Sequence, residues 1–203
     1  MGTRNITRIV LDDEIKVSQY CQWDGYPTYA GKEILEFIKE NDMELFKEQV
    51  RKTTLTITAD GVTSFYTGYP LREDVVEASN LYNEIIYNSS GGALEKRKEE
   101  ARERVEEELG LDTLLSYLIA SRDTGCEVLR LILEFDNLSF YTTRYLLGDT
   151  DWQIEAINTL DLDTNQLIMQ WHDKVLTISF DDIPGMDIEK EMQEFEKEED
   201  DDE

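Results

Sequence analysis

Two short blocks of polar and aromatic residues have the residue types that could bind a ligand. Residues 23–27 (WDGYP) place two aromatic rings and a carboxylate on a turn, because Asp-Gly favours chain reversal and Pro27 cannot donate to a sheet. Residues 122–125 (RDTG) form a charged turn ahead of an apolar helix. Rings stack on a small ligand and charges orient it, so a shared site is expected if the blocks meet on folding. The predicted ligand-binding residues are Trp23, Asp24, Tyr26, Arg122 and Asp123.

Both blocks also have a structural interpretation. Trp23 and Tyr26 could fill a corner at the edge of the core. The side chain of Asp123 or Thr124 could cap the helix that follows, while Arg122 forms an ion pair. The sequence leaves the two interpretations open.

A third segment, residues 161–165 (DLDTN), resembles the start of a calcium loop, in which alternate carboxylates and amides converge on one cation. The rest of that pattern is missing, because the sixth position is Gln166 rather than Gly and the twelfth is His172 rather than Glu. We therefore predict a hairpin turn here and no metal site.

The two cysteines do not form a catalytic pattern. Cys126 lies at helical spacing from Leu129 and Leu133, which is typical of a core residue, and Cys21 precedes the turn at Trp23. A cysteine nucleophile needs a basic partner, and the only histidine, His172, lies in a predicted turn. Glycine-rich phosphate loops and zinc-ligand spacings are also missing. We predict no catalytic residues and no cofactor, and these absences favour a binding protein while leaving enzymatic activity open.

Charge is the outlying property of the composition. The chain has 46 acidic and 20 basic residues, a net charge of −26 and a pI near 4.2. Affinity for nucleic acid comes from Lys and Arg that displace counterions from phosphates, so we expect no direct binding to nucleic acid. Residues 188–203 hold ten carboxylates and two lysines, hence most of the excess negative charge lies elsewhere in the chain.

The acidic C-terminal segment has two interpretations. The simpler one is a solvated, disordered extension. The functional one is a competitor for a basic protein partner, because clustered carboxylates imitate the phosphate charge that a nucleic-acid-binding protein expects. The predicted partner-binding residues are Glu194, Glu196, Glu198, Glu199, Asp200, Asp201, Asp202 and Glu203.

The sequence also carries expectations about location. The N-terminus lacks the apolar run of a secretory signal, and no stretch approaches the ~18 consecutive apolar residues of a membrane span. We expect a cytoplasmic protein with free thiols and no membrane partner.

Strand patterns occur at both ends of the chain. Residues 9–11 and 15–23 flank a polar turn at 12–14, which predicts a β-hairpin. Residues 153–180 contain three alternating apolar runs divided by turns at 163–165 and 172–174, which predicts an antiparallel meander. We expect hairpin and meander to pair in one antiparallel sheet, giving an α+β fold with the central helices packed on one face.

Helical spacing of apolar residues covers the middle of the chain. It begins near residue 31 and recurs at 75–86, 114–119 and 128–133. Residues 94–109 are mostly Glu, Lys and Arg with a narrow apolar stripe, so we expect a protruding, largely exposed helix at about 93–109. The expected organisation is one domain over residues 1–187 followed by a disordered acidic tail over 188–203.

The opening GTRN at residues 2–5, with QYCQWDGYP at 19–27 and Gly31, resembles a family of phage, bacterial and fungal proteins that share a GTRN…QYxQWDGYP…G opening. RDTG and DLDTN extend the resemblance to about a third of the chain. The family has no established activity, so the resemblance implies no mechanism. It does imply that neither thiol is a shared nucleophile, because members carry Gly at the position of Cys21 and Ala at that of Cys126.

Two functional hypotheses follow from these patterns. The first is an acidic inhibitor, a phage accessory or anti-defence factor that engages a basic, nucleic-acid-binding protein in the host cytoplasm. The alternative is a protein that binds, sequesters or hydrolyses a small molecule or nucleotide with residues 23–27 and the Arg122–Asp123 pair. Carboxylates gathered on one face would favour the first hypothesis, and a pocket shared by the two blocks would favour the second.

Overall fold

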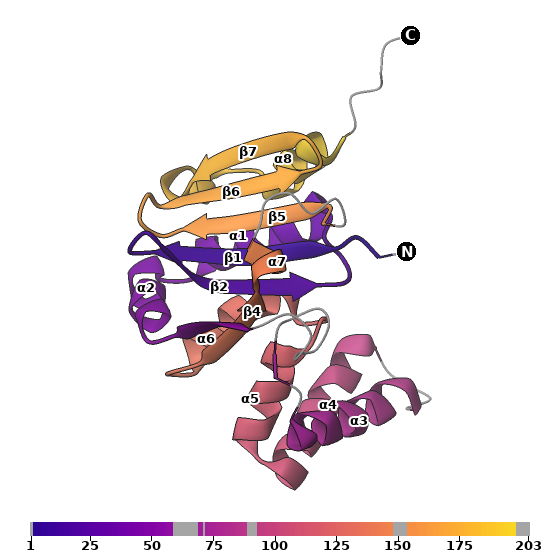
Figure 1. The fold of residues 1–203 in the computed structure, drawn as a ribbon. Helices are drawn as coiled ribbons and strands as arrows, with labels where there is room; N and C mark the ends of the chain where they lie inside the picture. Colours follow the sequence, from indigo (N-terminus) through magenta and orange to yellow (C-terminus); the bar gives the residue numbers. More distant parts are fainter. Residues whose placement is uncertain (1, 59–68, 71, 89–92, 148–153, 198–203) are drawn as a thin grey trace.

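The computed structural model describes residues 2–58, 69–70, 72–88, 93–147 and 154–197 of the chain (Figure 1). It confirms an α+β fold in which the N-terminal hairpin and the C-terminal strands form one five-stranded sheet, with helices between them in the sequence. The hairpin is β1 (Asn5–Leu11) and β2 (Glu14–Cys21). The meander is β5 (Ala156–Asp161), β6 (Gln166–Trp171) and β7 (Lys174–Ser179).

One strand pairing differs from the expected antiparallel sheet. The strand order is β2-β1-β5-β6-β7, and β1 runs parallel to β5 while the other neighbours are antiparallel. A parallel pair needs a long crossover connection, and the central part of the chain supplies it. The first strand therefore lies inside the sheet, with a neighbour on each side.

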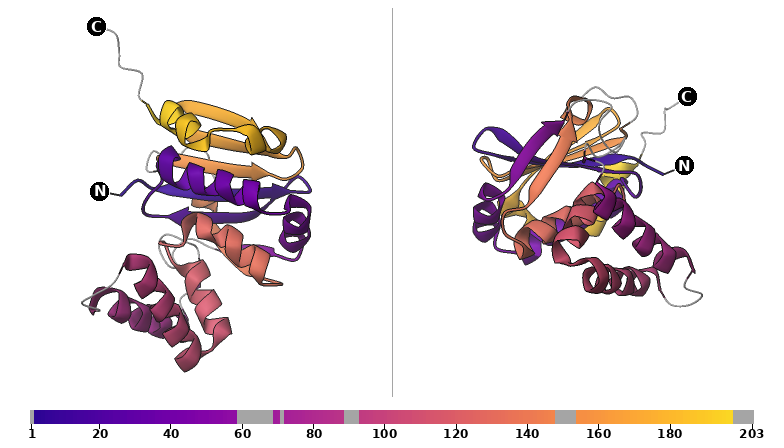
Figure 2. Two further views of the ribbon diagram at one scale, coloured as in Figure 1. Left: turned by 180° about the vertical axis from the view of Figure 1, so that it is seen from behind. Right: turned by 60° about the horizontal axis from the view of Figure 1, so that its bottom comes forward.

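The two faces of the sheet bury different layers (Figure 2). Side chains alternate along a strand, so Ile9, Val17 and Leu160 point into the main core. That face is covered by α1 (Lys32–Glu40), α6 (Val128–Glu134) and α8 (Ile188–Glu196). The opposite face carries a smaller cluster under Leu146 of α7 (Arg144–Leu147), so the expectation of helices on one face fails for this short helix.

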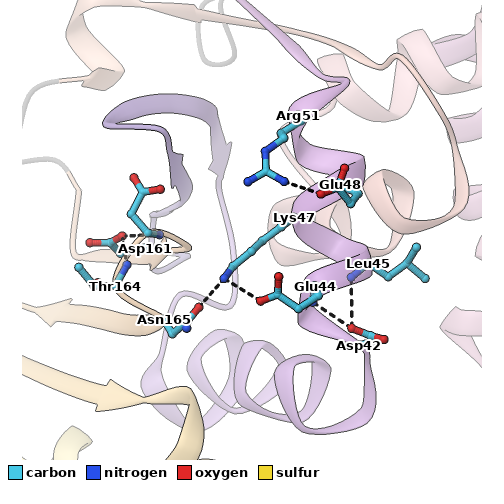
Figure 3. A network of polar contacts seen from close by, with 10 residues as sticks. Asp42, Glu44, Leu45, Lys47, Glu48, Arg51, Asp161, Thr164 and Asn165 are labelled. Atoms are coloured by element: carbon cyan, nitrogen blue, oxygen red, sulfur yellow. Dashed lines mark hydrogen bonds and ion pairs between the residues drawn. The ribbon is translucent and has the colours of Figure 1, made fainter.

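The turn predicted from the DLDTN segment joins β5 to β6, and that prediction is confirmed. Asp161 Oδ1 accepts hydrogen bonds from the backbone N–H groups of Asp163 and Thr164. Lys47 of α2 (Met43–Arg51) donates to Asn165 Oδ1 at 2.7 Å and to Glu44 Oε1 at 3.0 Å (Figure 3). The polar residues of this segment therefore stabilise the turn. Within the described ranges no group of three or more His, Cys, Asp or Glu is arranged to hold a metal ion.

Three helices form a separate unit beside the sheet (Figure 1). They are α3 (Glu73–Asn88), α4 (Leu94–Leu109) and α5 (Leu111–Ala120). The expected charged helix is α4. Its narrow apolar stripe packs inside the protein, because Ala101 and Val105 are fully buried. The helix is one side of a three-helix unit rather than an isolated protrusion.

A second small sheet was not predicted. Its two parallel strands are β3 (Thr54–Thr58) and β4 (Ser139–Thr143), and both segments are short and rich in threonine. Apolar alternation over so few residues does not separate a strand from a loop. Three short helical turns complete the fold: η1 (Pro27–Gly31), η2 (Gly125–Glu127) and η3 (Phe180–Gly185). In the described part of the chain, no helix combines the length and the apolar character that crossing a membrane would need.

The expected disordered tail is wrong for residues 188–196, which form α8. Ile188 and Met192 lie one helical turn apart and are buried, Met192 completely. Two of the predicted partner-binding carboxylates have contacts inside the protein: Glu196 accepts a hydrogen bond from the backbone N–H of Thr28 at 2.9 Å, and Glu194 pairs with Lys190. The surrounding charges concealed the apolar stripe. The predicted residues Glu198, Glu199, Asp200, Asp201, Asp202 and Glu203 lie outside the described residues.

Packing of α8 is testable through Met192. We expect Met192→Ala to lower the free energy of unfolding by about 2–3 kcal/mol, because it removes a fully buried side chain and leaves a cavity. The exposed neighbour change Gln193→Ala is the control and should cost less than about 0.5 kcal/mol. Urea denaturation of the two variants measures the difference. Equal stabilities would show that α8 does not pack on the core.

Candidate ligand-binding cleft

A cleft of about 430 Å³ lies between the end of the hairpin and the three-helix unit. This volume is within the range of small-molecule sites in proteins, roughly 300–1,000 Å³. The hairpin side contributes Asn5, Cys21, Trp23, Asp24, Tyr29 and Glu33. The three-helix unit contributes Tyr82, Asn83, Tyr87, Lys98, Arg102 and Tyr117. The chain after α5 contributes Ser121, Asp123, Cys126, Glu127 and Arg130.

The two polar blocks singled out in the sequence meet at this cleft. Trp23 Nε1 donates to Asp123 Oδ1 at 2.9 Å, across a separation of 100 residues. The backbone N–H of Gln22 donates to the carbonyl of Arg122 at 2.8 Å. Gln19 Nε2 donates to the carbonyl of Ser121 at 3.1 Å, just beyond the end of α5. The end of β2 is therefore tied directly to the end of the three-helix unit.

The Trp23 loop also rests on the first residues of the chain. Asn5 Nδ2 donates to the carbonyl of Trp23 at 2.9 Å, and the backbone N–H of Gly25 donates to the carbonyl of Thr3 at 3.1 Å. A Cβ at Gly2 would lie 2.0 Å from the indole ring, so only glycine allows this contact. Trp23 is nevertheless 44% exposed. The loop is thus both a packed corner and an accessible aromatic surface of the cleft.

Only part of the predicted ligand-binding set lines the cleft. Trp23, Asp24 and Asp123 do. The ring of Tyr26 lies instead against Trp171, with ring centroids 5.7 Å apart, and the exposed Arg122 joins the junction through its carbonyl. Neither Tyr26 nor Arg122 is among the residues of the cleft surface.

The helix-capping interpretation of the second block is not what the structure shows. Thr124 Oγ1 donates back to the carbonyl of Leu118, and Asp123 receives the indole of Trp23. Neither η2 nor α6 has a side-chain cap at its start. Gly125 has φ +52°, and its Cβ position is 3.0 Å from Cys21 Sγ, which explains why the block ends in glycine.

Both thiols belong to the cleft and both are held protonated. Burial raises the pKa of Cys21 to about 11, and the nearby carboxylates of Asp123 and Asp24 add to the rise. Burial also raises the pKa of Cys126, whose thiol donates to Glu33 Oε2 at 3.1 Å. The lone histidine, His172, packs against Trp171 and is not part of the cleft surface. The geometry therefore provides binding groups and no activated thiol.

The wall formed by α3 and α4 was missed at the sequence level. Its aromatic and charged members include Tyr82, Tyr87 and Arg102, with Arg102 paired to Glu127 of η2. A weak signal existed, since Asn83 and Tyr87 lie four residues apart, at the helical spacing of α3, and Tyr82 precedes them. Nothing local showed that this helix faces residues near the N-terminus.

Comparison with known proteins gives no relative for this chain: no family model, no curated protein and no solved structure matches it. The resemblance to the GTRN…QYxQWDGYP family rests on the quoted motifs and stays a prediction. Function is therefore inferred from the geometry and charge of the cleft.

Asp24 separates a backbone role from a binding role. Its φ is +55°, a left-handed conformation that Asp and Asn tolerate and that costs other residues roughly 1–2 kcal/mol. We expect Asp24→Ala to lower the free energy of unfolding by about 1 kcal/mol and Asp24→Asn to leave it unchanged. Urea denaturation measures both. If Asp24→Asn is as destabilising as Asp24→Ala, the carboxylate itself holds the turn.

The raised pKa of Cys21 predicts slow alkylation of the native protein. With the folded pKa near 11 rather than 9, the thiolate fraction at pH 8 falls about a hundredfold, and the reaction rate falls with it. A Cys126→Ser variant reports Cys21 alone, and the same variant in urea is the control. The group's contribution to stability is complete below pH 9 and is lost as the pH rises toward 11. Equal rates in the native and unfolded protein would contradict the assignment.

Proposed function

We propose that the protein binds a small molecule in the cleft between the Trp23 loop and the three-helix unit. The observation that carries the proposal is the Trp23–Asp123 hydrogen bond, which joins the two polar blocks on the surface of a cleft of about 430 Å³. Small-molecule sites commonly combine an aromatic or apolar lining with a few convergent polar groups, and this lining has both.

Binding is favoured over hydrolysis by the state of the potential nucleophiles. The thiols of Cys21 and Cys126 have raised pKa values, and the Cys126 thiol donates a hydrogen bond to the Glu33 carboxylate, whose negative charge disfavours the thiolate. Sequestering or sensing a ligand needs only the shape and polarity of the cleft. We therefore favour reversible ligand binding over a chemical reaction at this site.

The hypothesis of an acidic inhibitor with a basic protein partner stays a prediction. The net charge of −26 motivates it. Within the described part of its candidate surface, Glu196 and Glu194 are engaged with Thr28 and Lys190. The cleft is the more specific feature, because its groups converge from segments far apart in the chain.

A fragment screen tests the cleft with a built-in control. We expect small aromatic and aliphatic fragments to shift the indole N–H resonance of Trp23 in two-dimensional NMR spectra, assigned by its loss in Trp23→Phe. Tyr29→Ala should weaken these hits about tenfold, because an aromatic contact contributes on the order of 1 kcal/mol or more. Tyr29 lines the cleft and is 48% exposed, so the change should spare the fold.

Tyr26→Ala is the matched control. Tyr26 is on the same loop and 43% exposed, but its ring lies against Trp171 outside the cleft. Hits should bind this variant as they bind the unmodified protein. The proposal fails if no fragment shifts the Trp23 signal, or if Tyr26→Ala and Tyr29→Ala weaken binding equally.

A further inference from the structure

Near the end of the hairpin, the cleft gathers carboxylates from three separate segments. Asp24 follows β2, Glu33 lies in the first turn of α1, and Asp123 follows α5. Asp123 uses one oxygen for the indole of Trp23, while the carboxylate of Asp24 makes no hydrogen bond to any other described residue. Beside them, Trp23 and Tyr29 expose nearly half of their surface.

A buried acceptor without a donor lies among these groups. Asn5 is 1% exposed and is part of the cleft surface. Its Nδ2 donates to the carbonyl of Trp23, which fixes the orientation of the amide. Its Oδ1 is buried and receives no hydrogen bond from any described residue. A buried acceptor is costly to leave unpaired, so the position calls for a ligand that carries N–H donors.

The electrostatic environment has the sign that suits such a donor. Asp24 and Asp123 both raise the pKa of the Cys21 thiol, and Glu33 does so for Cys126, which places negative potential at both thiols. Three cations also line the cleft, all from the helical side and the chain after it. Lys98 and Arg102 come from α4, and Arg130 comes from α6. Arg102 forms an ion pair with Glu127.

We propose that the cleft binds a small organic cation, a primary amine or amidinium carried on an aromatic or apolar body. The inference rests on the proposed function, since it names the ligand class of the same site. The cationic group pairs with Asp24, donates to Asn5 Oδ1 and lies against the faces of Trp23 and Tyr29, which attract cations through their ring quadrupoles. The net charge of −26 draws such a ligand toward the protein and repels its anionic counterpart.

Three probes with the same phenylethyl body test the charge requirement. They are 2-phenylethylamine, 2-phenylethanol and 3-phenylpropionate, which carry an ammonium, a hydroxyl and a carboxylate group; each is titrated into the protein and followed through the Trp23 indole resonance. We expect the amine to bind at least about tenfold more tightly than either of the other two, with affinity that falls as salt rises. Asp24→Asn should weaken the amine about fivefold, and Asp182→Asn should not. Asp182 is exposed in η3, outside the cleft, so it matches the change in net charge.

The outcomes separate the inference from the proposed function. If the neutral or anionic probe binds as tightly as the amine, the cleft remains a small-molecule site, and the inference that its ligand is a cation is wrong. If Asp182→Asn weakens the amine as much as Asp24→Asn, the attraction is a property of the net charge, and the assignment of the cleft carboxylate is wrong. If none of the three probes shifts the indole signal, the inference is overturned, while the wider fragment screen still decides the proposed function.

A second ammonium source is distinguished in the same assay. The tripeptide acetyl-Gly-Lys-Gly-amide presents a lysine side chain with the same charge on an aliphatic body. Tighter binding of 2-phenylethylamine than of the tripeptide supports a free aromatic amine as the ligand. Tighter binding of the tripeptide supports the same cation site and assigns it to a lysine side chain.

Discussion

The hydrogen bonds between residues 19–23 and residues 119–123 tie the sheet to the three-helix unit, and the cleft depends on them. Its two sides belong to different structural units, so without this junction its groups would not converge. Gln19 contributes through its side-chain amide, Gln22 through its backbone N–H and Trp23 through its indole. Gly125 completes the contact, because its positive φ and lack of a side chain let the chain pass against Cys21. These contacts hold the sheet and the three-helix unit together and so bring the two sides of the cleft face to face.

The helix-facing side of the sheet is divided along its length. At one end Ile9, Val17 and Leu160 belong to the main apolar core. Toward the start of β1 the buried positions become polar, and atoms of Asn5, Thr7 and Asn158 are buried without a hydrogen-bond partner in the described chain. Such groups weaken a core by roughly 1–3 kcal/mol each, so stability alone would favour apolar residues there. Of the three, Asn5 reaches the cleft, which joins the polar end of the sheet to the proposed ligand site.

Negative charge has more than one use in this protein. Asp161 and Asp163 accept backbone hydrogen bonds in the hairpin turns, Glu196 binds the start of η1, and Glu127 pairs with Arg102. These carboxylates are part of the fold and are not available to a partner without loss of stability. The carboxylates at Asp24 and Asp123 instead border the cleft and help to keep the buried Cys21 thiol protonated. Position, rather than total charge, distinguishes the carboxylates with a binding role.

The sequence by itself determined the local structure and the identity of the two polar blocks. Period-two alternation identified the hairpin and the meander, and the failed calcium pattern correctly indicated a hairpin turn at Asp161. Alternation does not encode which strands become neighbours, so the parallel pairing of β1 with β5 came from the crossover made by the central chain. Dense charge around Ile188 and Met192 hid the stripe that packs α8 on the core. Only the tertiary structure decided that Tyr26 turns away to Trp171 while Tyr29, Tyr82 and Arg102 join the cleft, because a side chain's partners are set by contacts between segments far apart in the chain.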